Sequence, residues 1–153
     1  MYRSILVAYN GTPESRSALH ECIRLTPPSS TQVHLLAVIH PHDPLVDGEY
    51  GARAAYSTQE MMQEEQAKME RELAEGCRML QEAGLNTDIF LETGEPADII
   101  SNMAAKLGAD LVIVGHPRHR SWVQRWWRGS TDALLLGKVH CTLMIAPERA
   151  EAA

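Results

Sequence analysis

The chain has 153 residues, which suits one domain with a full core, and its 44% hydrophobic and 22% charged residues are typical of a globular protein. Its formal net charge of -6 argues against nucleic-acid or anionic-membrane binding by the surface as a whole, and leaves room for a local basic patch. The apolar run at the N-terminus is too short for a signal peptide, and no stretch approaches the ~20 apolar residues that span a bilayer, so we expect a cytoplasmic protein.

The first quarter of the chain predicts two strands with a helix between them. Residues 4–9 and 32–40 are short, continuous apolar runs, as in strands of a parallel sheet that is covered on both faces. Between them, Thr12 is a suitable N-cap and Pro13 a suitable first residue for a helix, which two consecutive prolines end.

The next segment predicts a loop followed by one long helix. Residues 41–56 contain proline, glycine and aspartate and are typical of a loop. Residues 57–83 have helical periodicity, and Gly84 suits a C-terminal cap. The helix has an apolar stripe that we expect to pack in the core, formed by Met62, Met69, Leu73 and Leu80.

The rest of the chain continues to alternate between strands and helices. Strands are expected at 86–94, 110–115 and 141–147, and helices at 96–108 and 130–140. Such alternation implies a doubly wound parallel sheet, in which ligands bind outside the carboxyl ends of the strands. We therefore expect a single α/β domain over residues 1–148, a frayed tail over 149–153 and a ligand site at that sheet edge.

The cysteines predict no covalent framework. Cys22, Cys77 and Cys141 are odd in number, far apart and without a Cys-x-x-Cys pair, which argues against disulfides and a structural zinc site. We expect reduced, mostly buried thiols.

One segment departs from the acidic character of the chain. Residues 115–131 contain all three tryptophans, four arginines and two histidines, and no acidic residue. Gly115 suits a tight turn, Gly129 lets a ligand approach the backbone closely, and Ser130 and Thr131 supply hydroxyls at the start of the last helix. Because free N–H groups and the helix dipole favour an anion there, the segment predicts an anion site, and a plain helix cap fits the same residues.

The aromatic and histidine side chains near this edge leave alternatives open. Packing onto the domain or onto a partner subunit is the interpretation we favour over base stacking for Trp122, Trp126 and Trp127. Four histidines follow two strands, but no helical His pair and no cysteine partner supports a metal site formed by His40, His42, His116 and His119.

Four segments carry a resemblance to the universal stress protein family: "ILVAYNGTPESRSAL", "LLAVIH", "GEPADIISNMAAKLGADLVIVG" and "GSTDALLLGKVHCTLMIAP". They occur in the family's order and spacing and cover nearly the whole chain. The resemblance implies a three-layer, five-stranded parallel sheet in the order 3-2-1-4-5, a Rossmann-like fold of the adenine nucleotide alpha hydrolase type. It also implies a homodimer, for which we expect the edge strand 141–146 to pair with a second copy.

The resemblance further implies a nucleotide site, since some members bind ATP through the pattern G-x2-G-x9-G-(S/T). Ala8 and Asn10 would lie near the base and ribose, and the backbone of Val38 near the adenine edge. The ribose and phosphates of ATP, with magnesium, would be surrounded by Gly115, Gly129, Ser130 and Thr131. The resemblance carries over no catalytic residue and no metal ligand.

The chain departs from this pattern in ways that predict weak or absent ATP binding. Arg118 stands where the second glycine is expected, and ten residues rather than nine precede Gly129. The Arg118 guanidinium either fills the phosphate space or contacts phosphate directly. The acid that usually closes the first strand is Asn10, which lacks the acceptor strength of a carboxylate.

These observations favour a stress-response regulatory module, with unidentified partner proteins, that binds an adenine nucleotide. The alternatives are a nucleotide-free protein-interaction module and a weak ATP hydrolase. An enzyme is the weaker class, because the sequence offers no nucleophile and base pair with local support.

Overall fold

The computed structural model describes residues 1–40, 51–118 and 131–149, and the side chains of all of these except 51–58 and 131–134. Strands and helices follow one another in the order β1 (Ser4–Ala8), α1 (Pro13–Arg24), β2 (Gln32–Ile39), α2 (Gly51–Glu82), β3 (Asn86–Thr93), α3 (Pro96–Lys106), β4 (Leu111–His116), α5 (Thr131–Lys138) and β5 (Thr142–Pro147). All pairings are parallel, and the strand order β3-β2-β1-β4-β5 confirms the predicted doubly wound sheet.

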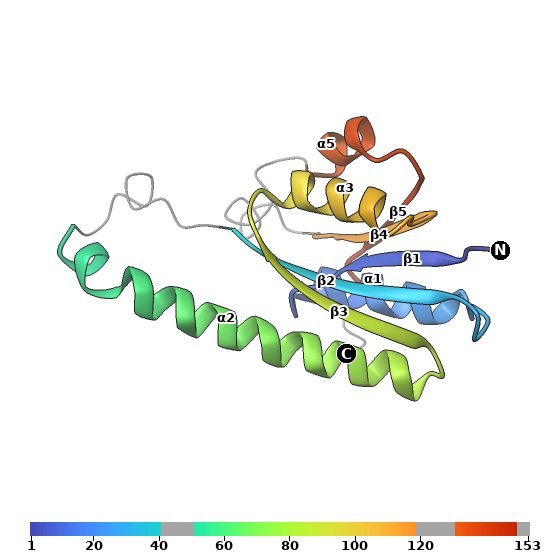
Figure 1. Cartoon of the computed structure of the whole chain (residues 1–153), viewed down its shortest axis with the longest axis horizontal. Coiled ribbons are helices and arrows are strands. Elements are labelled where there is room, and N and C mark those ends of the chain that lie inside the picture. The colour runs from blue at the N-terminus through green and yellow to red at the C-terminus, as the bar shows by residue number, and fades with distance from the viewer. Residues whose placement is uncertain (41–50, 119–130, 150–153) are drawn as a thin grey trace.

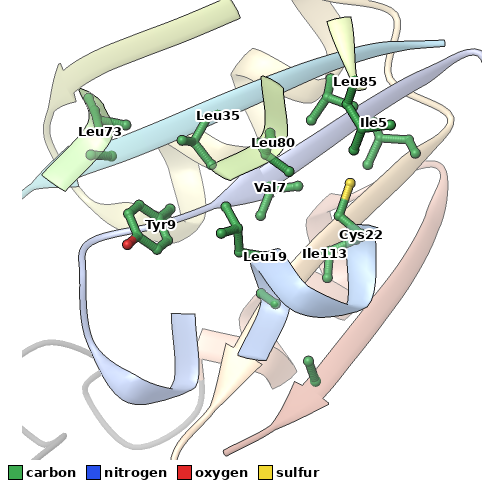
Figure 2. Close-up of a cluster of buried hydrophobic side chains, with 14 of the residues drawn as sticks. Ile5, Val7, Tyr9, Leu19, Cys22, Leu35, Leu73, Leu80, Leu85 and Ile113 are labelled. Atoms are coloured by element: carbon green, nitrogen blue, oxygen red, sulfur yellow. The ribbon is translucent and has the colours of Figure 1, made fainter. Parts of the chain in front are cut away.

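Helices cover the sheet on both faces, with α1 and α2 on one side and α3 and α5 on the other (Figure 1). Alternate residues of β1 supply the two layers of core, because successive side chains of a strand point to opposite faces. Ile5 and Val7 pack with α1 and α2, whereas Leu6 and Ala8 pack with α3 and α5. Figure 2 shows part of the first cluster, in which Cys22 of α1 is fully buried.

The start of α1 follows the sequence signals. Thr12 is the N-cap, and its Oγ1 accepts a hydrogen bond from the Ser15 N–H at 3.4 Å. Pro13 is the first helical residue, and the helix ends at Arg24, before the two prolines. The predicted cap is thereby confirmed, and it fixes the turn that leads from β1 into α1.

Helix α2 differs from its prediction in two ways. It begins at Gly51, so residues 51–56 are helical and the predicted loop is too long. The alanine-rich segment 52–55 has a high helix propensity. This propensity outweighs the preference for a loop that Asp47 and Gly48 indicate just before it. Met62 is 46% exposed, whereas Met69 is buried, because the first turns of the helix project beyond the sheet (Figure 1).

The remaining elements match their predicted positions to within two residues. Gly84 and Gly108 follow the ends of α2 and α3 at φ of +83° and +63°, which favours glycine. Strand β5 pairs only with β4 and lies at the edge of the sheet, as expected.

Within the described ranges the three cysteines are free. In the same ranges, no helix is long and apolar enough to cross a membrane.

The last described residues lie along α1. The Arg149 N–H donates to Ser17 Oγ at 3.1 Å, and its guanidinium donates to Glu21 Oε1 at 2.8 Å. Arg149 belongs to the segment for which a frayed tail is predicted, and residues 150–153 of that segment lie outside the described residues.

Candidate functional site

The carboxyl ends of β1 and β2 enclose a hollow of about 20 Å³, next to the point where the order of winding reverses between β1 and β4. Its lining comes from β1, the turn that follows it, the first turn of α1, β2 and α3: Ala8, Tyr9, Asn10, Ser15, Leu36, Val38 and Ile100. Three of the sequence-predicted site residues, Ala8, Asn10 and Val38, are thus brought together.

Asn10 is the most constrained polar group of this site. It is only 7% exposed, and its Oδ1 accepts hydrogen bonds from the Thr12 N–H at 3.1 Å and from the Thr12 hydroxyl at 2.6 Å. Its own N–H donates to Ser15 Oγ at 3.3 Å. Its Nδ2 is buried and has no hydrogen-bond partner among the described residues. Burying an unpaired donor costs about 1–3 kcal/mol, so a hydrogen-bond acceptor that reached Nδ2 would stabilise this amide.

The orientation of the Asn10 amide follows from its partners. The Thr12 N–H can only donate, so the atom that faces it must be the oxygen of the Asn10 side chain. Rotating the amide by half a turn would bring the NH2 group against another donor. The nitrogen is therefore the end of the side chain that remains without a partner.

Val38 offers backbone groups at the same edge. The Leu36 carbonyl accepts from the Tyr9 N–H at 2.8 Å, so the peptide groups of Leu36 face β1. Peptide groups two residues apart on a strand face the same neighbour, and the groups of Val38 therefore face the same side, beyond the end of β1. The predicted role of the Val38 backbone is compatible with this placement.

Gly115 serves a different purpose from the predicted tight turn, which is wrong. It lies inside β4, in register with Ala146 of β5. A Cβ atom on Gly115 would lie 2.0 Å from the Glu14 carbonyl oxygen at the start of α1. The glycine is required because the backbone of α1 packs directly on β4 at this position.

Arg118 is exposed, and its backbone is already engaged. The Arg118 N–H donates to Glu148 Oε2 at 3.0 Å, and the Glu148 N–H donates to the His116 carbonyl at 2.8 Å. The backbone donor at the position of the family's second glycine therefore faces a carboxylate.

Part of the predicted site lies outside the described residues. This applies to Gly129 and Ser130, to all three tryptophans and to the side chain of Thr131, which is the first residue of α5. Their predicted roles stay predictions.

The described histidines have separate surroundings. His40 Nε2 lies 3.0 Å from Glu95 Oε2 at the carboxyl edge, and His42 and His119 lie outside the described residues. No group of three or more His, Cys, Asp or Glu side chains with metal-binding geometry occurs in the part of the chain that the structure describes. His34 is buried near the amino edge, where its Nε2 lies 3.1 Å from Ser4 Oγ, and burial lowers its pKa.

Four lining residues were missed from the sequence: Tyr9, Ser15, Leu36 and Ile100. Leu36 has a usable signal, because it lies two residues before Val38 and therefore on the same face of the strand. Ser15 has a weaker one, as the third residue after a threonine N-cap. Nothing in the sequence near Ile100 distinguishes it from the other apolar residues of α3.

Comparisons with known proteins agree with this architecture. Universal stress protein Sll1388 of Synechocystis sp. is 26% identical over 151 residues, covering 94% of this chain and 97% of the relative. A universal stress protein family protein from Arabidopsis thaliana, solved with AMP bound, has 18% identity and a TM-score of 0.69, covering 97% of this chain and 94% of that chain. A universal stress protein solved in complex with cAMP has 17% identity and a TM-score of 0.63, covering 97% of this chain and 98% of that chain.

The two solved structures share the five-stranded fold of the adenine nucleotide alpha hydrolase type. The model of the Universal stress protein family matches residues 1–147, from before β1 to the end of β5. With the sheet order, the matched length and a full-length relative in agreement, the chain belongs to the universal stress protein family.

Proposed function

We propose that this protein is a cytoplasmic regulatory module of the stress response that binds an adenine nucleotide at the carboxyl edge of β1 and β4. The observation that carries the proposal is the buried, unpaired Nδ2 of Asn10, in a hollow whose other walls are largely apolar. The hollow of about 20 Å³ admits only the edge of a ligand, and a nucleoside can present an apolar ring edge or a hydrogen-bond acceptor there. AMP and cAMP complexes of similar proteins support an adenine nucleotide as the ligand.

The phosphate end of the site favours a mononucleotide over ATP. The Arg118 N–H is taken by the Glu148 carboxylate, which would repel a phosphate chain at that point. Replacing a glycine by Arg118 and adding one residue to the segment before Gly129 both alter the family's phosphate pattern. We therefore expect ATP to bind weakly, and AMP or cAMP to bind more tightly.

A homodimer through β5 completes the proposal. The strand has a neighbour on one side only, and its Ile145 side chain is 39% exposed. An apolar edge strand invites pairing with another strand, and a second copy supplies an identical one. The free cysteines fit a reducing compartment such as the cytoplasm.

The test of the proposed function is the ligand state of the purified protein. Mass spectrometry of the supernatant released by heat should detect AMP, cAMP or another adenine nucleotide. Calorimetric titration should then give saturable binding of AMP or cAMP, weaker binding of ATP with magnesium, and no binding of inorganic phosphate at the same concentrations. Absence of any adenine nucleotide binding would favour the nucleotide-free interaction module.

A further inference from the structure

A second buried polar group lies at the amino edge of the sheet, the edge opposite the hollow. His34 is the third residue of β2, and its side chain is only 8% exposed. Its Nε2 lies 3.1 Å from Ser4 Oγ of β1, and that hydroxyl donates to the Leu107 carbonyl at the end of α3 at 3.4 Å. Its Nδ1 has no hydrogen-bond partner among the described residues, and Asp88 Oδ2 of β3 lies 3.7 Å from it.

This row of groups, from Asp88 through His34 and Ser4 to Leu107, lacks one proton while the imidazole is neutral. Its three links need three protons, of which the Ser4 hydroxyl supplies one and a neutral imidazole one. A proton on Nε2 leaves Nδ1 as an acceptor that faces the Asp88 carboxylate. A proton on Nδ1 makes Nε2 accept from Ser4, which takes the hydroxyl proton away from Leu107. Only an imidazolium, protonated on both nitrogens, satisfies every link.

The link to Asp88 is open in the structure and free to close. A separation of 3.7 Å is too long for a hydrogen bond, and the Asp88 side chain is 57% exposed, so solvent surrounds much of its carboxylate. In the described sheet, β3 pairs only with β2 and forms one edge (Figure 1). Closing this link would therefore add a side-chain tie between the edge strand and the buried centre of the sheet.

Other charged groups near this row are exposed or already engaged. Lys106 lies in the last turn of α3 and is exposed. Asp110 follows α3, and its Oδ2 accepts from the N–H of Arg3 at 2.9 Å. Arg3 is itself exposed. Asp88 is thus the charged group that lies next to the unpaired nitrogen of His34.

Burial and Asp88 act on His34 in opposite directions. Burial lowers the pKa of His34 and is the larger effect, whereas the Asp88 carboxylate raises it. On the α2 side of β3, burial and then Asp88 raise the pKa of the Cys77 thiol, so this thiol stays neutral while His34 titrates. The imidazole therefore takes up its proton below the ordinary value of about 6.5.

We propose that His34 is a proton switch: when it is protonated, the Asp88 carboxylate moves onto Nδ1, and a continuous hydrogen-bond chain joins β3, β2, β1 and the end of α3. The proton comes from solvent and binds the vacant ring nitrogen. Nδ1–H then donates to Asp88, Nε2–H donates to Ser4 Oγ, and the Ser4 hydroxyl donates to the Leu107 carbonyl. The switch lies at the amino edge and does not rest on the proposed nucleotide site.

The test is nuclear magnetic resonance of the His34 ring nitrogens and the Asp88 carboxyl carbon between pH 8 and 5. The variants are Asp88→Asn and the control Glu92→Gln, which removes the same charge from the same face of β3 four residues away. In wild type, both signals should change with one shared midpoint. Asp88→Asn should bind the proton about 1.5- to 5-fold more weakly, the range for an ion pair with an exposed partner. Glu92→Gln should match wild type.

Hydrogen exchange shows whether the edge strand responds. The protection of β3 amides in wild type, relative to Asp88→Asn at the same pH, should rise as the pH falls through the His34 midpoint. Dispersed amide spectra at each pH check that the proteins are folded. The proposal would be overturned by an imidazole that stays neutral down to pH 5, by an Asp88 carbon signal that does not follow His34, or by equal midpoints in wild type and Asp88→Asn.

Discussion

Substituting Gly115 by alanine should destabilise the protein and disturb the ligand site together. The added Cβ would lie 2.0 Å from the Glu14 carbonyl oxygen, 2.3 Å from the Glu14 carbonyl carbon and 2.9 Å from the Ser15 nitrogen. All three are backbone atoms, so no side-chain rotation can relieve the contact. Because Cβ atoms are essentially never found closer than 3.0 Å to another heavy atom, β4 and the start of α1 must separate by about 1 Å.

The size of the effect follows from this separation. Overpacking of a core typically costs about 1–3 kcal/mol, and a contact that moves two backbone segments belongs at the upper end, near 3 kcal/mol. For a domain of about 150 residues, 1 kcal/mol corresponds to roughly 2–4 °C in Tm, so Gly115→Ala should lower Tm by about 6–12 °C. Ser15 would move with α1 and weaken its hydrogen bond to the Asn10 N–H, so nucleotide affinity should fall as well.

Gly137→Ala is the matched control. Gly137 lies in α5, is exposed, and has open space within 4 Å of an added Cβ. Alanine is favoured over glycine in a helix by about 0.5–1 kcal/mol, so this variant should be equally stable or slightly more stable than wild type. Differential scanning calorimetry measures both. If Gly115→Ala kept the wild-type Tm and lost only nucleotide binding, Gly115 would serve ligand approach and the packing argument would be refuted.

Three further predictions concern other parts of the molecule. Arg118→Gly, which restores the family's second glycine, should raise the affinity for ATP with magnesium in calorimetric titration, and weaker binding would instead make Arg118 a phosphate ligand. Burial lowers the pKa of His34 from its ordinary value of about 6.5. Below that value the unfolded chain binds more protons than the folded protein does. The free energy of unfolding should therefore decrease as the pH falls from about 6.5 through the folded-state pKa. Denaturant unfolding at pH 7.5 and 5.5 should show this loss in wild type and a smaller one in His34→Gln, and equal losses would contradict it. Ile145→Lys on the exposed edge of β5 should shift the sedimenting species from about twice the chain mass to one, and an unchanged dimer would place the interface elsewhere.

Most of the fold was predictable because its signals are local. The buried strands are continuous apolar runs, and the start of α1 is marked by Thr12 and Pro13, which act through the backbone of their own turn. Gly84 and Gly108 mark helix ends for the same reason, since each occupies a left-handed conformation. Alternation of such segments is enough to specify a parallel, doubly wound sheet.

What the sequence did not predict depends on distant parts of the chain. The exposure of Met62 is set by the length of α2 relative to the sheet, which helical periodicity does not contain. The reason for Gly115 lies at Glu14, on an element far away in the sequence. The Arg118 backbone is engaged by Glu148, which follows the last strand.

Asn10 has some features that local sequence predicts and one that depends on distant parts of the chain. Its position at the end of β1 was predicted from the resemblance, and its hydrogen bonds to Thr12 arise within the same turn. The burial of Nδ2 depends on packing around the hollow, which involves Leu36 and Ile100 from two other elements. The polarity of the site therefore became apparent only from the folded structure.

The central claim, that an adenine nucleotide binds at Asn10, is tested most directly by nuclear magnetic resonance of the side-chain amides during titration with AMP. The Asn10 Nδ2 resonances are identified by their absence from the spectrum of Asn10→Asp. We predict that they shift in a saturable manner, with the same Kd that calorimetry gives for AMP. Saturable AMP binding that leaves the Asn10 resonances in place, with shifts confined to the amino edge of the sheet around Ser4 and His34, would contradict the claim.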